Sequence, residues 1–241
     1  MTSVYLIIPI FNGEAHVENT CRKLAHICRE QQLFSHIVFV NDGSHDKTGV
    51  YIETYSQDID AEVDIYTYEK NRGKGFALKY GISHSDIKDD DIVVFTDVDI
   101  PYGFDVIRQV ITMLAQDTRL DMVVGNRKHH LTNTTQYTKY RALAHHVFRM
   151  CMPSQLRSIP DTQCGMKVFR GHVAGVLFSS LKTFRWVFDI ELFLLAQKHG
   201  YTMKDIAVII EKESLEARSS LSFLKHALSV FRDLLVIYRT Y

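Results

Sequence analysis

Two carboxylates, one residue apart, follow an apolar run in the segment "VVFTDVDIPYG" (93–103). Residues 92–96 are apolar or β-branched and predict a buried strand, so Asp97 and Asp99 fall where that strand should end. Side chains at i and i+2 of an extended segment point the same way, and two such carboxylates repel unless a cation is near. Carboxylate oxygens suit Mg²⁺ or Mn²⁺, which also bind phosphate. The pattern predicts a metal–diphosphate site, with a solvated turn as the alternative.

Polar residues also follow three other predicted strands. These are Asn12 after 4–10, Asp42 at the end of 35–42, and Asn71 after 63–69. Ligands of parallel sheets bind beyond the carboxyl ends of the strands, so we expect these residues to share one site with Asp97 and Asp99. Asp42, at a strand end before an Asp-Gly turn, is suited to accept hydrogen bonds from a nucleobase imide or a ribose.

The segment "NRGKG" (71–75) combines two glycines and two cations at the expected start of a helix. Such a loop can contact phosphates or a base. It matches neither the Walker pattern nor G-x-G-x-x-G, so neither a P-loop ATPase nor a dinucleotide oxidoreductase is favoured. An ordinary basic turn is the alternative.

Strand and helix patterns alternate through the first half of the chain. This rhythm predicts an α/β fold with a mostly parallel, Rossmann-like central sheet and helices on both faces. The second half is less regular. The expected strands are 4–10, 35–42, 63–69, 91–99, 120–128, part of 161–170, and 202–211; the expected helices are 14–31, 46–55, one opening in 71–82, 137–152, 185–200 and 220–241.

Composition narrows the class of protein. The 241 residues suit one large α/β domain, and 28 basic against 28 acidic residues give no basic excess for binding nucleic acid. Cys21, Cys28, Cys151 and Cys164 form no metal pattern and predict free thiols in a reducing compartment. Without a signal peptide or an apolar run of about 18 residues, we expect a cytoplasmic protein, with peripheral membrane attachment left open.

Seven segments, in this order, resemble family 2 glycosyltransferases of the GT-A fold. The later segments are most similar to the polyprenyl-phosphate branch, which includes dolichyl-phosphate β-glucosyltransferases. The matching segments are "PIFNGE" (9–14), "VNDGSHDKT" (40–48), "NRGKGFAL" (71–78), "FTDVDIP" (95–101), "GNR" (125–127), "DTQCGMKVF" (161–169) and "RWVFDIELFLLA" (185–196).

The resemblance implies an inverting enzyme that moves a sugar, with glucose as the candidate, from a UDP-sugar to a polyprenyl phosphate with the help of Mg²⁺ or Mn²⁺. It places Asp97 toward the nucleoside and Asp99 on the metal, with both acids at the metal site. The implied nucleotide pocket comprises Pro9, Asn12, Glu14, Asp42, Arg72, Gly73 and Lys74.

The resemblance also implies residues at the reacting centre. Asp161 is the acidic candidate there, and Arg127 is the cation for the acceptor or the leaving phosphate. The implied sugar contacts are Gln163, Trp186, Asp189 and Glu191. Because a phosphate acceptor is anionic, it needs cations more than a base, and Arg141 and Lys139 are also available for it.

Two alternatives stay open. The same donor chemistry could act on a hydroxyl of a soluble or cell-surface glycan, with Asp161 as general base. The chain could instead be a non-catalytic nucleotide-sugar-binding partner of a membrane enzyme. Many members of the polyprenyl-phosphate branch carry long transmembrane helices after the catalytic domain and a Trp near 208–222, which this sequence lacks. These departures weigh against the lipid acceptor more than against the glycosyltransferase family.

The tail shows its own amphipathic pattern. We expect a catalytic domain over 1–219 and an amphipathic helix over 220–241 that contacts a membrane surface or a second copy of the chain. Docking of this helix on the catalytic domain is the alternative.

Overall fold

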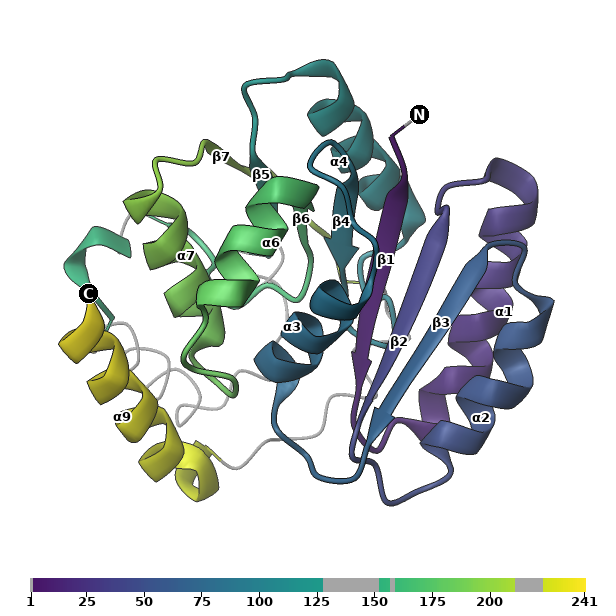
Figure 1. Ribbon diagram of the computed structural model, residues 1–241, viewed down its shortest axis with the longest axis horizontal. Helices are drawn as coiled ribbons and strands as arrows, with labels where there is room; N and C mark the ends of the chain where they lie inside the picture. The colour runs from purple at the N-terminus through teal and green to yellow at the C-terminus, as the bar shows by residue number, and fades with distance from the viewer. Residues whose placement is uncertain (1, 128–151, 157–158, 211–222) are drawn as a thin grey trace.

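One mixed sheet of seven strands, in the order β3-β2-β1-β4-β6-β5-β7, organises the fold (Figure 1). The computed structural model describes residues 2–127, 152–156, 159–210 and 223–241. Six strands run in one direction, and β6 is antiparallel to both of its neighbours, β4 and β5. The predicted α/β architecture with a mostly parallel sheet is confirmed.

The first half of the chain follows the predicted alternation closely. Its hydrophobic runs form parallel strands, and a helix connects each of these strands to the next. The elements are β1 (Val4–Ile10), α1 (Glu14–Gln31), β2 (His36–Asp42), α2 (Thr48–Tyr55), η1 (Ser56–Asp58), β3 (Glu62–Tyr68), α3 (Lys74–His84) and β4 (Ile92–Phe95).

The second half contains two helices, α4 and α6, that the sequence patterns did not predict. The helix expected over 137–152 falls, apart from Met152, outside the described residues. The elements are α4 (Phe104–Gln116), β5 (Met122–Asn126), η2 (Ser154–Leu156), β6 (Lys167–Arg170), α6 (Gly171–Ser180), α7 (Phe188–Lys198), β7 (Met203–Ala207) and α9 (Phe223–Thr240).

Helices cover both faces of the sheet because each central strand is apolar on both sides. Successive residues of β1, such as Leu6 and Ile7, enter different hydrophobic clusters. One cluster joins the sheet to α3, α6, α7 and α9, and the other joins it to α1, α2 and α4. In the first cluster, Phe95, Phe169 and Phe178 pack with ring centroids 5.8–6.1 Å apart.

The C-terminal helix α9 docks on the rest of the domain through one face. Val230, Leu234 and Ile237 are buried in the same cluster as residues of α7. On another face, Phe231, Leu235 and Tyr238 are exposed. The sequence left docking of this helix on the rest of the chain as an alternative. The structure shows such docking for the inner face of α9. Among the helices of the described residues, none has both the length and the apolar character needed to cross a bilayer.

We predict that Phe169→Ala destabilises the protein by about 3–5 kcal/mol, because it removes a fully buried ring from the Phe95 and Phe178 cluster. Urea unfolding followed by circular dichroism measures the change. Phe231→Ala is the matched control, since the Phe231 side chain is 62% exposed and its loss should change stability by less than about 0.5 kcal/mol. Equal losses for the two variants would contradict this packing.

Candidate functional site

The reversed strand β6 brings its first residue to the edge of the sheet where the parallel strands end. Lys167 pairs in register with Phe95, the last residue of β4, and with Val124 of β5. Asp42 ends β2, and Asn126 ends β5 at the same edge. The residues predicted from separate strand ends are therefore gathered along one edge, as expected for a sheet of this kind.

Asp97 and Asp99 lie in a turn rather than in an extended strand. The strand β4 ends at Phe95, and the amide of Ile100 donates to the carbonyl of Asp97 over 3.0 Å. The hydroxyl of Thr20 in α1 donates to the carbonyl of Val98 and ties this turn to the helix. The expected strand over 91–99 therefore ends four residues before Asp99, and a turn replaces the extended geometry expected for this pair.

An ion pair connects Asp97 to the start of α3. The Nζ atom of Lys74 lies 2.5 Å from Oδ1 of Asp97. Burial alone would lower the pKa of Lys74, but the charge of Asp97, then that of Asp189, raises it above its ordinary value, so Lys74 is an ammonium ion. The Asp97 side chain is still 40% exposed. A Cβ atom at Gly165 would collide with the Asp97 carboxylate, so any other residue there would force this carboxylate to move.

Lys167 is a buried cation of this edge that sequence reasoning missed. Its Nζ atom donates to Oδ1 of Asp189 over 2.6 Å and to the carbonyl of Cys164 over 2.8 Å. The ammonium also lies 5.3 Å from the centroid of Phe95. A lysine within the apolar run "MKVF" was the available signal, but its position depends on the reversed direction of β6.

Asp161 and Arg127 form a two-pronged ion pair. The Nε and Nη2 atoms of Arg127 donate to the two carboxylate oxygens over 2.7 and 2.9 Å, and the amide of Gln163 donates to Asp161 over 3.1 Å. Burial alone would raise the pKa of Asp161, but the hydrogen bonds and charge of Arg127 outweigh it and hold the pKa below its usual range. Asp161 is thus a carboxylate with both oxygens engaged, which makes it a weak general base.

The carboxylate of Asp42 shapes the 71–75 loop. It accepts hydrogen bonds from the amides of Arg72 and Gly73, over 2.7 and 2.9 Å, and from the side chain of Asn71 over 2.9 Å. Gly73 has φ of 102°, and a Cβ there would lie 2.5 Å from the carbonyl oxygen of Phe184. Asp42 therefore fixes the loop that presents Lys74, and a contact with uracil stays a prediction.

Asn12 and Glu14 hold two neighbouring loops together. The Oδ1 atom of Asn12 accepts from the amide of His45 over 2.9 Å, and Oε2 of Glu14 accepts from the amide of Lys47 over 2.8 Å. Pro9 lies in β1, paired with Val40 of β2. These residues connect the loops after β1 and β2 at the strand edge, and their proposed contact with a nucleotide stays a prediction.

The residues predicted for the sugar occupy different surroundings. Asp189 is paired with Lys167, and Trp186 packs partly buried against the core. The Nε2 atom of Gln163 is buried and has no hydrogen-bond partner among the described residues. Arg141 and Lys139 lie outside the described residues.

The expected position of Glu191 at a sugar pocket is not what the structure shows. Its side chain is fully buried. Its carboxylate accepts hydrogen bonds from the amides of Lys182 and Thr183, and from the Thr183 hydroxyl, over 2.7–3.1 Å. It faces these loop donors because they supply the hydrogen bonds that a buried carboxylate needs.

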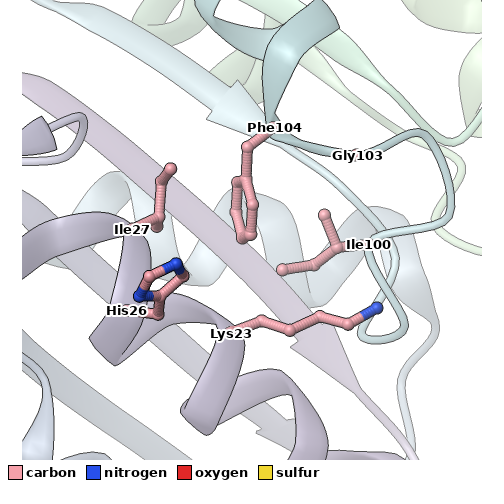
Figure 2. Close-up of a pocket in the computed structure, with 6 residues that line it drawn as sticks. All are labelled: Lys23, His26, Ile27, Ile100, Gly103 and Phe104. Atoms are coloured by element: carbon pink, nitrogen blue, oxygen red, sulfur yellow. The ribbon is translucent and has the colours of Figure 1, made fainter. Parts of the chain in front are cut away.

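A pocket of about 230 Å³ lies between α1 and the chain that follows Asp99 (Figure 2). Its lining residues are Lys23, His26, Ile27, Ile100, Gly103 and Phe104. None of the charged pairs described above lines it, so it is separate from the strand-edge site. Within the described part of the chain, no group of three or more His, Cys, Asp or Glu side chains is arranged to hold a metal ion.

Solved structures with a similar fold are glycosyltransferases. Glucosyl-3-phosphoglycerate synthase from Mycobacterium tuberculosis superposes with a TM-score of 0.64 and 16% identity over 92% of this chain and 75% of that chain. Mannosyl-3-phosphoglycerate synthase from Rubrobacter xylanophilus gives 0.64 and 16% over 97% and 73%. The fold is therefore GT-A, a Rossmann-like sheet with its charged site at the strand edge.

The family follows from sequence comparison. The model of the family described as "Glycosyl transferase family 2" matches residues 5–178, and the chain belongs to this family.

The names of the curated relatives are more specific than the description of the family. The chain is 30% identical over 215 residues to the dolichyl-phosphate beta-glucosyltransferase of Drosophila melanogaster, and 30% identical over 219 residues to that of Homo sapiens. Each alignment covers 84% of this chain and 65% of the relative. The chain thus spans slightly less than two thirds of the length of these relatives.

We predict that Asp161→Asn lowers stability at neutral pH by about 3–5 kcal/mol, because it leaves the buried Arg127 without its charged partner. Since the folded-state pKa of Asp161 is lowered, the stability it contributes is present above the unfolded pKa and is lost as the pH falls through the folded value. The difference between wild type and variant should therefore shrink below roughly pH 4.

Urea unfolding at a series of pH values measures this difference. Asp105→Asn is the control, because the Asp105 side chain is 98% exposed and pairs with Arg108 only at 3.5 Å. A constant difference between wild type and Asp161→Asn from neutral to acid pH would contradict the ion pair.

Proposed function

We propose that the protein transfers glucose from UDP-glucose to a polyprenyl phosphate, with inversion at the anomeric carbon. The observation that carries the proposal is the Lys74–Asp97 pair at the strand edge, where a cation and a partly exposed carboxylate lie side by side. This combination suits a diphosphate and its metal ion. The names of the curated relatives support glucose and a dolichyl-phosphate acceptor.

The donor site extends along the loops after β1, β2 and β3. In this proposal, Lys74 contacts the diphosphate and the loop fixed by Asp42 borders the nucleoside. Among the structures with this fold, one is described in complex with Mn²⁺ and UDP, which supports a uridine nucleotide here. Pro9, Asn12, Glu14, Arg72 and Gly73 complete the proposed pocket.

The carboxylates at the turn after β4 suit a divalent metal ion that is also bound by the substrate. Two carboxylates, Asp97 and Asp99, lie at the turn, whereas no larger protein cluster is arranged for a metal in the described residues. Mg²⁺ in phosphate sites is held by one or two carboxylates with substrate oxygens and water, so these residues fit. When bound, Mg²⁺ or Mn²⁺ would act as a Lewis acid that stabilises the charge on the departing diphosphate.

The geometry at Asp161 favours a phosphate acceptor over a hydroxyl. A hydroxyl acceptor needs a general base, and both oxygens of Asp161 are engaged by Arg127 while its pKa is lowered. A phosphate oxygen is already anionic and attacks the anomeric carbon directly. The new carbon–oxygen bond forms as the bond to UDP breaks, which inverts the configuration.

Three residues are proposed to orient the sugar. Gln163 offers a buried amide nitrogen that no described group accepts from, which a sugar hydroxyl would satisfy. Asp189 is held by Lys167, whose ammonium also donates to the carbonyl of Cys164, the residue after Gln163. Trp186 presents an aromatic ring suited to stack on a sugar. Lys167 and Arg127 supply positive charge near the two phosphates.

We predict that the purified protein transfers labelled glucose from UDP-glucose to dolichyl phosphate in detergent when Mn²⁺ or Mg²⁺ is present. Asp99→Asn should lower turnover by roughly 100-fold or more, because it removes a group that stabilises charge at the leaving diphosphate. Asp105→Asn, an exposed acid elsewhere in the chain, is the control.

Turnover of Asp99→Asn at the wild-type rate would show that the metal assignment is wrong. Binding of UDP-glucose without transfer to any acceptor would favour the non-catalytic binding partner. Transfer to a soluble glycan hydroxyl, with dolichyl phosphate inert, would overturn the lipid acceptor.

A membrane surface is the proposed partner of the outer face of α9. Phe231, Leu235 and Tyr238 recur at helical spacing on that face, and Arg232 and Arg239 are exposed beside them. Apolar and basic residues in this arrangement suit the headgroup region of an anionic bilayer. The protein would then act peripherally on the cytoplasmic face of a membrane, where a lipid-linked acceptor lies.

We predict that the protein floats with vesicles of phosphatidylcholine and phosphatidylglycerol, and that the double variant Phe231→Ser and Leu235→Ser remains in the aqueous layer. The change removes apolar side chains from the exposed face and leaves the buried face intact. Val50→Ser is the control, because Val50 is an exposed apolar residue of α2. Equal flotation of both variants would contradict the membrane contact, and a wild-type dimer lost only in the double variant would identify a second copy as the partner.

A further inference from the structure

The C-terminal helix makes a polar contact with a buried carboxylate of α7. The hydroxyl of Tyr241, directly after α9, donates to Oε1 of Glu191 over 3.0 Å. Burial raises the pKa of the Tyr241 hydroxyl, and the charge of Glu191 raises it further, so the hydroxyl keeps its proton and remains a donor. Val230, Leu234 and Ile237 bury the inner face of α9 in the same cluster as α7.

Glu191 in turn holds the segment that precedes α7. Its Oε2 atom accepts from the amide and the hydroxyl of Thr183, each over 2.7 Å. The amide of Lys182 is shared between the two carboxylate oxygens at 3.1 Å from each. Among the described residues, Tyr241 is therefore the second donor to Oε1, and losing it would leave that oxygen with only the shared amide.

The segment after Thr183 contacts the 71–75 loop directly. The amide of Gly75 donates to the carbonyl of Phe184 over 2.9 Å. The guanidinium of Arg185 donates to the side-chain and main-chain oxygens of Asn71 over 3.3 Å. Asn71 also donates to Asp42, which binds the amides of the same loop. In Figure 1, α9 and α7 lie on the left of the view, and α3 lies nearer the centre.

These contacts form a continuous path from the C-terminal helix to the loop that presents Lys74. We propose that Glu191 and Tyr241 are positioning residues, which hold the 182–185 segment against the 71–75 loop and thereby set the affinity for the nucleotide. The inference rests on the proposed function for the identity of the nucleotide, but the path itself consists of protein contacts. It also gives Glu191 a role that replaces the sugar contact expected from the sequence.

The test uses Tyr241→Phe, which removes one hydroxyl at a partly exposed position and leaves the ring in place. Without any ligand, amide hydrogen exchange should become faster in peptides covering 71–75 and 182–185. The Kd for UDP should rise about 3- to 10-fold, the effect of losing one ordinary hydrogen bond. KM for UDP-glucose should rise by a similar factor while kcat changes little.

Tyr51→Phe is the matched control, because Tyr51 lies on α2, which packs against the opposite face of the sheet. Glu191→Gln should speed exchange in the same two peptides more strongly, since it removes the charge that gathers the donors. Unchanged exchange at 71–75 in Tyr241→Phe would overturn the inference, as would a lower Tm with an unchanged Kd for UDP. Failure of the wild-type protein to bind UDP would overturn the proposed function instead, and the exchange data would still decide the positioning role.

Discussion

A carboxylate can be buried at the edge of a sheet only if donors replace the water it loses, and this requirement organises the site. Amides of the 71–75 loop supply the donors for Asp42, and Lys74 supplies one for Asp97, which is only partly buried. Arg127 encloses Asp161, and Lys167 holds Asp189. Each pairing also fixes a loop or a strand end. The hydrogen bonds and ion pairs that stabilise these charges therefore also set the shape of the site.

The same pairings suit the proposed transfer of a sugar from a nucleoside diphosphate to a phosphate acceptor. Positive charge from Lys74, Arg127 and Lys167 is held in place before any substrate binds, so little reorganisation is needed when a diphosphate leaves. The acids that hold these cations are engaged and ill suited to remove protons. A site of this kind favours acceptors that arrive already ionised, which is the chemical reason for preferring a lipid phosphate to a hydroxyl.

The parts of the fold that depend on local sequence were predictable. The strand over 4–10 and the helix over 14–31 lie where their hydrophobic patterns placed them. The direction of β6 was not predictable, because strand pairing is a long-range choice that an apolar run does not encode. Lys167 was missed for that reason. Glu191 was misplaced because helix position alone does not say which donors a carboxylate will meet.

A crystal structure with UDP and Mn²⁺ tests the central claim most directly. The account predicts that the diphosphate lies beside Lys74, with the metal between it and the carboxylates of Asp97 and Asp99, and that the 71–75 loop borders the nucleoside. The account would be contradicted by UDP bound elsewhere, for example in the pocket beside Lys23 and His26, with the Lys74–Asp97 pair unchanged.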